Sequence, residues 1–132
     1  MSDELSDDAS VPTHLFDLDE ASACLPELRE RLPALRDARA TLVDASARIA
    51  QAVAADGGGV AGSEWFRAQQ VLREQLEWLV ERGILLRDPL TGLVDFPAER
   101  DGEPIFLCWR LGEPTIAFFH GERAGYAGRR GL

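Results

Sequence analysis

The sequence contains no lysine, so all 14 of its basic side chains are arginines, and it has only one tyrosine and one methionine. We interpret the missing lysine as a bias of composition, not as a feature of function. No apolar run approaches the roughly 18 residues that a membrane-spanning helix needs. Residues 1–13 also lack the basic and apolar segments of a secretory signal peptide, so we expect a cytoplasmic protein without membrane contact.

Cysteine is scarce as well. Cys24 and Cys108 are the only two, and neither belongs to a CxxC or similar pair, so we expect two free, reduced thiols. Motifs such as GxSxG and HExxH are absent, and the serines fall in helical or capping contexts. No catalytic residue and no cofactor are therefore predicted, and the pattern leaves open whether the protein is an enzyme.

The formal net charge of −9 is concentrated near the N-terminus. Residues 1–20 carry seven acidic side chains and no arginine, which leaves only −2 for the rest of the chain. Residues 1–13 are too polar to bury themselves and are predicted to be a disordered acidic tail. An acidic surface repels phosphate backbones, so nucleic acid is an unlikely partner class.

The remaining residues, 14–132, are expected to form a single domain. Its first helix is predicted over residues 18–55, because Asp17 and Glu20 have the spacing of a capping box. Pro26 and Pro33 lie inside this span, so we expect one helix that bends at both prolines. The apolar residues of this span recur at alternating steps of three and four, as in a heptad pattern. Arg39 and Ser46 occupy its two polar positions. The apolar positions are Leu25, Leu28, Leu32, Leu35, Leu42, Ile49 and Val53.

A second, shorter helix is predicted over residues 64–82, after the glycine-rich segment 56–62. Gly83 is expected to end it. Its heptad positions are Trp65, Gln69, Leu72, Leu76 and Leu79. The two helices should form an antiparallel hairpin, and the longer one extends beyond what the shorter one can cover. We therefore predict a coiled-coil-like homodimer through the helical hairpins, similar to a four-helix bundle.

Residues 84–120 are predicted to form a β-meander of four antiparallel strands. Asp101-Gly102 is the strongest hairpin signal in the chain. The fold class is therefore α+β, a long two-helix antiparallel hairpin packed on a small antiparallel β-meander. Residues 121–132 are predicted to be a basic, glycine-rich C-terminal tail, and the sequence leaves open whether this tail is ordered.

Four stretches of the chain resemble a prokaryotic family known as domain of unknown function 2203. They are FDLDEASACLPELR, GLVDFPA, LCWRLGE and the C-terminal FHGERAGYAGRRGL, so the resemblance covers residues 14–132. It implies no activity. This chain departs from the family pattern in placing Gly121 between His120 and Glu122, and in its acidic N-terminal extension.

An arginine inside a strand pattern needs a carboxylate, a carbonyl cluster or a bound anion as its partner. Arg110 is such a residue, and Asp95 and Glu113 are its predicted internal partners. With His120 and two arginines near the C-terminus, Arg129 and Arg130, it could alternatively form a cationic pocket for a small acid or phosphate.

Side chains that zinc accepts also occur in this region: Asp95, Cys108, His120 and Glu122. Strand register decides whether they meet, because a one-residue shift moves a side chain to the other face. If His120 lies opposite Leu107, it faces away from Cys108, whereas opposite Phe106 it shares the face of Cys108. We predict no metal site; Cys108 is expected to be a small buried apolar residue and His120 a hydrogen-bonded residue at a strand end.

Two functions therefore remain. The first, which we favour, is a small self-associating interaction or structural module. The second is a domain, catalytic or not, that binds a small molecule or anion around Arg110 and His120.

Overall fold

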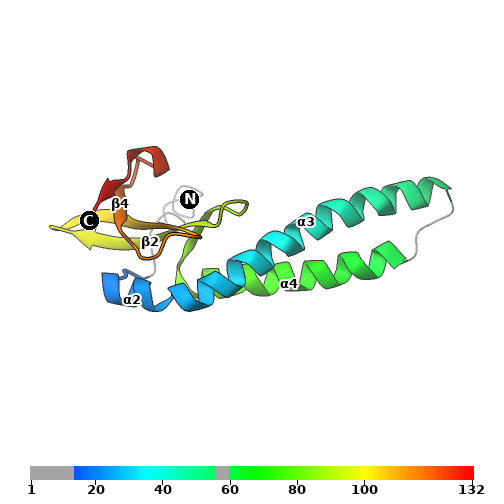
Figure 1. Ribbon diagram of the computed structural model, residues 1–132, viewed down its shortest axis with the longest axis horizontal. Helices are drawn as coiled ribbons and strands as arrows, with labels where there is room; N and C mark the ends of the chain where they lie inside the picture. Colours follow the sequence, from blue (N-terminus) through cyan, green and yellow to red (C-terminus); the bar gives the residue numbers. More distant parts are fainter. Residues whose placement is uncertain (1–13, 56–59) are drawn as a thin grey trace, which may run out of the picture.

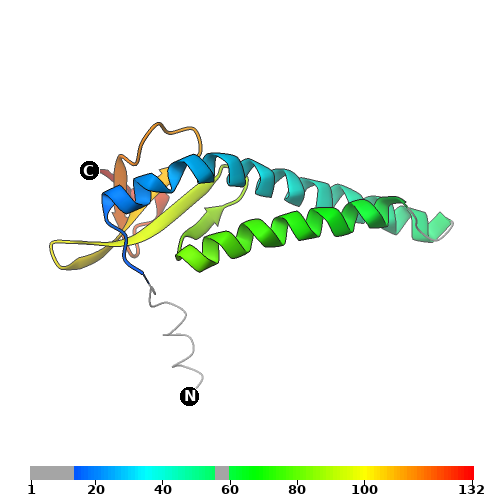
Figure 2. The ribbon, with the colours of Figure 1, turned by 90° about the horizontal axis from the view of Figure 1, so that it is seen from below.

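The computed structural model describes residues 14–55 and 60–132 (Figure 1). A helical hairpin extends to one side of a small sheet, so the molecule is elongated (Figures 1 and 2). This arrangement confirms the predicted α+β class with a helical hairpin and an antiparallel meander. The predicted acidic tail and the centre of the glycine-rich loop lie outside the described residues.

The first predicted helix is two helices, α2 (Leu18–Ala23) and α3 (Leu25–Ala55). Asp17 caps α2 and Glu20 closes the expected capping box. The chain breaks at Cys24 and not at the prolines, since Pro26 falls in the first turn of α3, where a missing N–H costs little. Pro33 remains inside α3. The prediction of a single helix over residues 18–55 was therefore wrong, because the chain forms two helices there.

Helix α4 (Val60–Arg82) runs back along α3 and begins before the predicted start at residue 64. Gly83 follows it with a φ of 76°, and Ile84 N–H donates to the Leu79 carbonyl. This is the glycine stop that the sequence predicted. None of the described helices is both long and apolar enough to cross a lipid bilayer.

The sheet has five antiparallel strands in sequential order, one more than predicted. They are β1 (Leu85–Asp88), β2 (Leu93–Arg100), β3 (Glu103–Arg110), β4 (Phe118–Gly121) and β5 (Arg130–Gly131). The extra strand comes from the C-terminal segment, which turns through a 3-10 helix at Tyr126–Gly128 and pairs with β4. The part of the chain read as a tail is therefore structured.

Two turns set the strand register. Asp101 and Gly102 both have positive φ, at 54° and 80°, as the tight β2–β3 hairpin requires. Gly92 precedes β2 with a φ of 72°, and a Cβ atom there would lie 2.7 Å from Leu111 Cβ. Any larger residue at position 92 would push β2 away from the end of β3.

One face of the sheet packs on the helices. Leu28 and Leu35 of α3 are buried against Val94 and Phe96 of β2 and Trp109 of β3 in a single core. Because side chains alternate along a strand, the neighbouring residues of β2, β3 and β4 point to the other face. That outer face holds the polar residues of interest.

Candidate functional site

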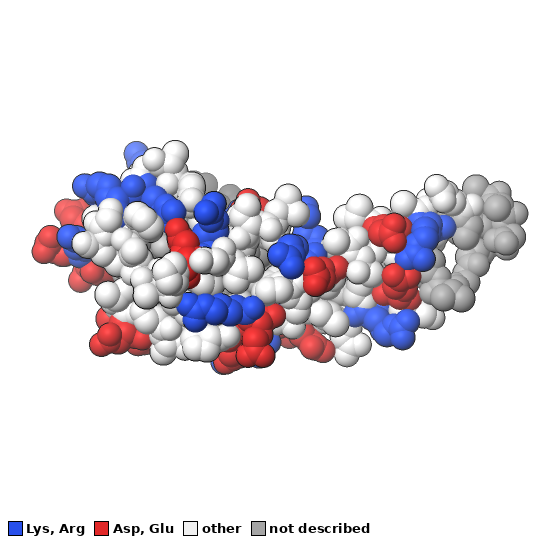
Figure 3. Space-filling model, viewed as in Figure 1, with Lys and Arg blue, Asp and Glu red and all other residues white. Residues whose placement is uncertain are grey.

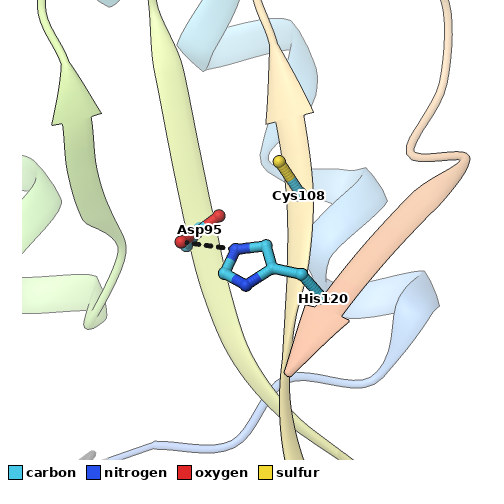
Figure 4. Close-up of side chains that lie close together, drawn as sticks. All are labelled: Asp95, Cys108 and His120. Carbon is cyan, nitrogen blue, oxygen red and sulfur yellow. Dashed lines mark hydrogen bonds and ion pairs between the residues drawn. The ribbon is translucent and has the colours of Figure 1, made fainter. Parts of the chain in front are cut away.

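Three polar side chains meet on the outer face of the sheet: Asp95 of β2, Cys108 of β3 and His120 of β4 (Figure 4). Asp95 pairs with Cys108 across β2 and β3, and His120 pairs with Phe106 across β3 and β4. All three are buried, with exposed fractions of 2%, 0% and 2%. Their ligand atoms lie within 4.8 Å of one another.

The carboxylate of Asp95 is held from two sides. Its Oδ2 lies 2.9 Å from His120 Nε2 and accepts from Arg87 Nε at 2.8 Å. Its Oδ1 is buried and accepts no hydrogen bond of normal geometry from the described residues, although the Cys108 thiol is close enough to interact weakly with this carboxylate. A buried oxygen without a partner usually costs about 1–3 kcal/mol, so this atom calls for an explanation.

The ring of His120 is fixed at both nitrogens. Nδ1 lies 2.7 Å from the carbonyl oxygen of Gly121, which can only accept a hydrogen bond. Nδ1 must therefore carry the hydrogen and donate it. Nε2 is the nitrogen that faces the other two residues of the cluster (Figure 4).

The thiol of Cys108 is held in its protonated form. Burial raises the pKa of this thiol to about 11, and the negative charge of Asp95 adds to the effect, while Arg129 opposes it. Arg129 Nη1 lies 4.0 Å from Cys108 Sγ. Free Cys108 is therefore a poor nucleophile at neutral pH.

Arg129 joins the C-terminal segment to this face of the sheet. It donates two hydrogen bonds to Glu113, at 3.2 and 2.7 Å, and both side chains are mostly buried. Its guanidinium carbon lies 4.1 Å from the ring centre of Phe118 and 4.2 Å from that of Tyr126. The ion pair and the two rings keep residues 126–131 in place beside Cys108.

The Arg129–Glu113 pair predicts a pH dependence. Burial alone would raise the pKa of Glu113, but hydrogen bonds from Arg129 and from the Arg110 N–H hold that pKa below its ordinary 4.5. Because the folded-state pKa is depressed, the stabilisation is complete above about pH 4.5 and is lost as pH falls through the folded-state value.

We therefore expect Arg129→Met to lower the free energy of unfolding by about 1–3 kcal/mol at neutral pH. The difference from wild type should shrink once the pH falls below the folded-state pKa of Glu113, because the carboxyl is then protonated in both proteins. Urea unfolding at neutral pH and at a pH below that pKa measures it. Arg130→Met, at the exposed neighbouring position, is the control, and a deficit that is the same at both pH values would contradict the prediction.

The structure does not gather the predicted cationic residues in one pocket. Arg110 is exposed, with its guanidinium carbon 6.0 Å from the ring centre of Tyr126. Arg130 lies over Phe119 and Arg129 over Phe118. Phe118 and Phe119 are neighbours on β4, so the two arginines lie on opposite faces of the sheet. His120 faces Asp95.

The predicted acidic partners are used by other groups. Asp95 binds Arg87 and His120, and Glu113 binds Arg129. The Glu113 carboxylate accepts from the backbone N–H of Arg110 at 2.9 Å, and the Glu113 N–H donates to the Arg110 carbonyl at 2.9 Å. Of the two registers that the sequence allowed, the one that pairs His120 with Phe106 is observed.

Sequence reasoning did not identify Arg87 or Tyr126 as neighbours of the cluster. Arg87 lies on the edge strand β1, where Leu85 pairs with Asp95. An arginine two residues after the start of a strand gives no sequence signal that predicts its partner. Arg87 becomes a partner only because the pairing of β1 with β2 brings its side chain within 2.8 Å of the buried Asp95.

Comparison with known proteins identifies one family. No curated protein and no solved structure matches the chain. A family described as "Uncharacterized conserved protein (DUF2203)" matches residues 14–132, which includes both helical segments, the sheet and the C-terminal strand. The chain belongs to this family of uncharacterized conserved proteins, DUF2203.

Proposed function

We propose that the protein is a self-associating interaction module, in which the hairpins of two copies pair antiparallel through one face of α4. The observation that carries this proposal is the distribution of apolar side chains in the part of the hairpin beyond the sheet. There the fully buried residues are alanines, and large apolar side chains of α4 such as Phe66 are exposed.

The interior of the outer hairpin is made of alanine. Ala38 and Ala45 of α3 and Ala68 of α4 are buried between the helices. Alanines let the two helices approach closely, but each contributes little apolar area. Two helices joined in this way are weakly stabilised by their own contact.

The outer surface of α4 is apolar along one stripe. Leu72, Leu76 and Val80 follow one another at steps of four residues and line a shallow groove, with Gln69, Arg73, Glu77 and Glu81 at its edges. Val80 is 75% exposed and Phe66, one turn before the groove, is 68% exposed. Large apolar side chains that gather on one face, with a polar edge, are typical of association surfaces.

The charges at the edge of this stripe favour a second copy of the same chain. If two α4 helices cross antiparallel near Leu76, Leu72 of one copy comes opposite Val80 of the other. Arg73 then lies beside Glu81 of the second copy, and symmetry repeats the pair. Figure 3 shows that positive and negative groups alternate along the hairpin with uncharged surface between them.

The expected affinity is weak. Covering Phe66, Leu76 and Val80 in both copies is worth on the order of 5–10 kcal/mol, given about 1.5–3 kcal/mol for a fully buried side chain. Association itself costs about 4–15 kcal/mol, so the net gain is at most about 6 kcal/mol and the dimer should form only from tens of micromolar upward. One charge placed in the stripe should be enough to abolish it.

Val80→Glu tests the proposal. The variant should remain monomeric in sedimentation velocity from low to high micromolar concentration, while the wild type shifts toward twice the monomer mass. Val43→Glu is the matched control, because Val43 is also exposed, at 66%, and lies on α3 outside the stripe. A wild type that stays monomeric throughout would refute self-association, and equal dissociation by both variants would refute the α4 face.

Anion binding around Arg110 is the second candidate. Its support is the exposed guanidinium of Arg110 and the gathering of arginines at the sheet end of the molecule (Figure 3). It ranks second because Arg129 and His120 already have carboxylate partners.

We also propose a cytoplasmic location, on the basis of the two free thiols.

A further inference from the structure

We propose that Asp95, Cys108 and His120 form a binding site for a divalent cation of the zinc type. This site lies on the outer face of the sheet, away from the α4 stripe. A failure of the self-association proposal would therefore not affect it. The inference rests on the donor set, on the hydrogen bonds around it and on the buried oxygen that accepts no normal hydrogen bond from the described residues.

The three donors suit a borderline-soft divalent ion. An imidazole nitrogen, a thiolate sulfur and a carboxylate oxygen are the ligand types that Zn²⁺ accepts, and the mixture disfavours Mg²⁺ and Ca²⁺, which prefer oxygen alone. They come from three adjacent strands, so backbone pairing sets their positions. Three protein ligands leave a fourth position for a water or another small ligand.

The ring of His120 is oriented as a metal ligand. Its Nδ1–H donates to the Gly121 carbonyl, as the second nitrogen of a metal-bound histidine usually does, and this leaves Nε2 to face Asp95 and Cys108. Nε2 is thus the ring nitrogen available to a cation bound within the cluster.

Asp95 supplies a second, independent observation. Its side chain is 98% buried in a position where Oδ2 already binds Arg87 and His120, yet Oδ1 accepts no hydrogen bond of normal geometry from the described residues. A metal held by this carboxylate would satisfy that oxygen. Arg87, which is 43% exposed, can keep its bond to Asp95 from the solvent side as the group that orients the ligand.

Charge balance also fits. On binding, Cys108 releases its thiol proton to solvent and becomes a thiolate, and no electron is transferred. The thiolate and the Asp95 carboxylate then bring two negative charges, which offset the two positive charges of the ion. Arg129, 4.0 Å from the sulfur, would stabilise the thiolate.

The geometry needs only small shifts of side chains. Tetrahedral zinc with bonds of about 2.0–2.3 Å has ligand atoms about 3.3–3.8 Å apart. The three ligand atoms lie within 4.8 Å of one another, and His120 Nε2 and Asp95 Oδ2 are 2.9 Å apart. Rotation of the side chains can open the short distance and close the longer ones, while the strands keep their pairing.

The alternative is a buried ion pair between Asp95 and His120 that binds no metal. Titration of the full-length, reduced protein with Co²⁺ separates the two cases, because a cobalt–thiolate bond gives an intense near-ultraviolet charge-transfer band. We expect this band to saturate at one Co²⁺ per chain and to disappear when one equivalent of Zn²⁺ is added. A wild type that shows no saturable band and no stoichiometric Zn²⁺ by elemental analysis overturns the proposal, whatever the variants do.

The two cysteines of the chain provide an internal control. Cys108→Ser should lose the band and weaken Zn²⁺ binding at least about 100-fold, since even an outer partner of a metal ligand is worth about 10–100-fold. Cys24→Ser should keep both properties, because Cys24 lies in the break between α2 and α3. A band that survives Cys108→Ser, or one lost in Cys24→Ser, would overturn the assignment.

Discussion

His120→Leu is expected to lower the free energy of unfolding by about 3 kcal/mol when measured in the presence of a chelator. The substitution removes the buried partner of Asp95 at 2.9 Å and leaves a carboxylate that is 2% exposed. Breaking a buried pair typically costs about 3–5 kcal/mol. The lower end applies here because Arg87 still contacts the same oxygen.

The double variant Asp95→Val with His120→Leu provides the decisive comparison. Removing both partners of a buried pair is often neutral or stabilising, because no charge is then left without a partner. We therefore expect the double variant to be more stable than His120→Leu alone, and His14→Leu, at the exposed histidine, to be close to wild type. A double variant as unstable as the sum of its parts would show that packing and not charge sets the cost.

Trp109→Ala is expected to lower the free energy of unfolding by about 3–5 kcal/mol, a large part of the 5–15 kcal/mol typical of a domain. The Trp109 side chain is fully buried between the sheet and α3, and its indole N–H donates to the Glu113 carbonyl at 3.0 Å. The variant thus loses apolar contact on the helix face and leaves a carbonyl without its partner. Urea unfolding should show a lower midpoint with an unchanged slope.

Trp65→Ala is the matched control for this substitution. Trp65 lies on the outer hairpin, is only partly buried and donates to Ser46 Oγ at 3.1 Å. Its loss should cost about 1 kcal/mol. If the two variants lost the same free energy of unfolding, the contact of Trp109 with α3 would not be part of the main core.

The comparison between sequence and structure is most informative in the helices. The leucine pattern predicted the hairpin, and Leu28 and Leu35 are buried. Beyond the sheet, however, the α3 residues that are buried between the two helices are Ala38 and Ala45, and Leu42 is only partly buried. A heptad pattern records where apolar side chains recur, but the distance between the two helices decides which of them lie inside.

The C-terminal segment shows the opposite case. Its glycines and arginines resemble an unstructured tail, yet β5 pairs with β4, and Arg129 binds Glu113. These contacts join residues that are far apart along the chain, and no local pattern encodes them. The fifth strand was therefore outside the reach of sequence reasoning.

The sequence by itself determined the class of the fold, the two helical segments, the Asp101-Gly102 hairpin and the residue types from which a site could be built. These follow from periodicity, caps and turn chemistry, which act over a few neighbouring residues. Only the tertiary structure decided that His120 faces Phe106 and shares a face with Cys108 and Asp95. A shift of one residue reverses the face of every side chain on a strand, and the pairing of β3 with β4 is a long-range contact that local sequence does not specify.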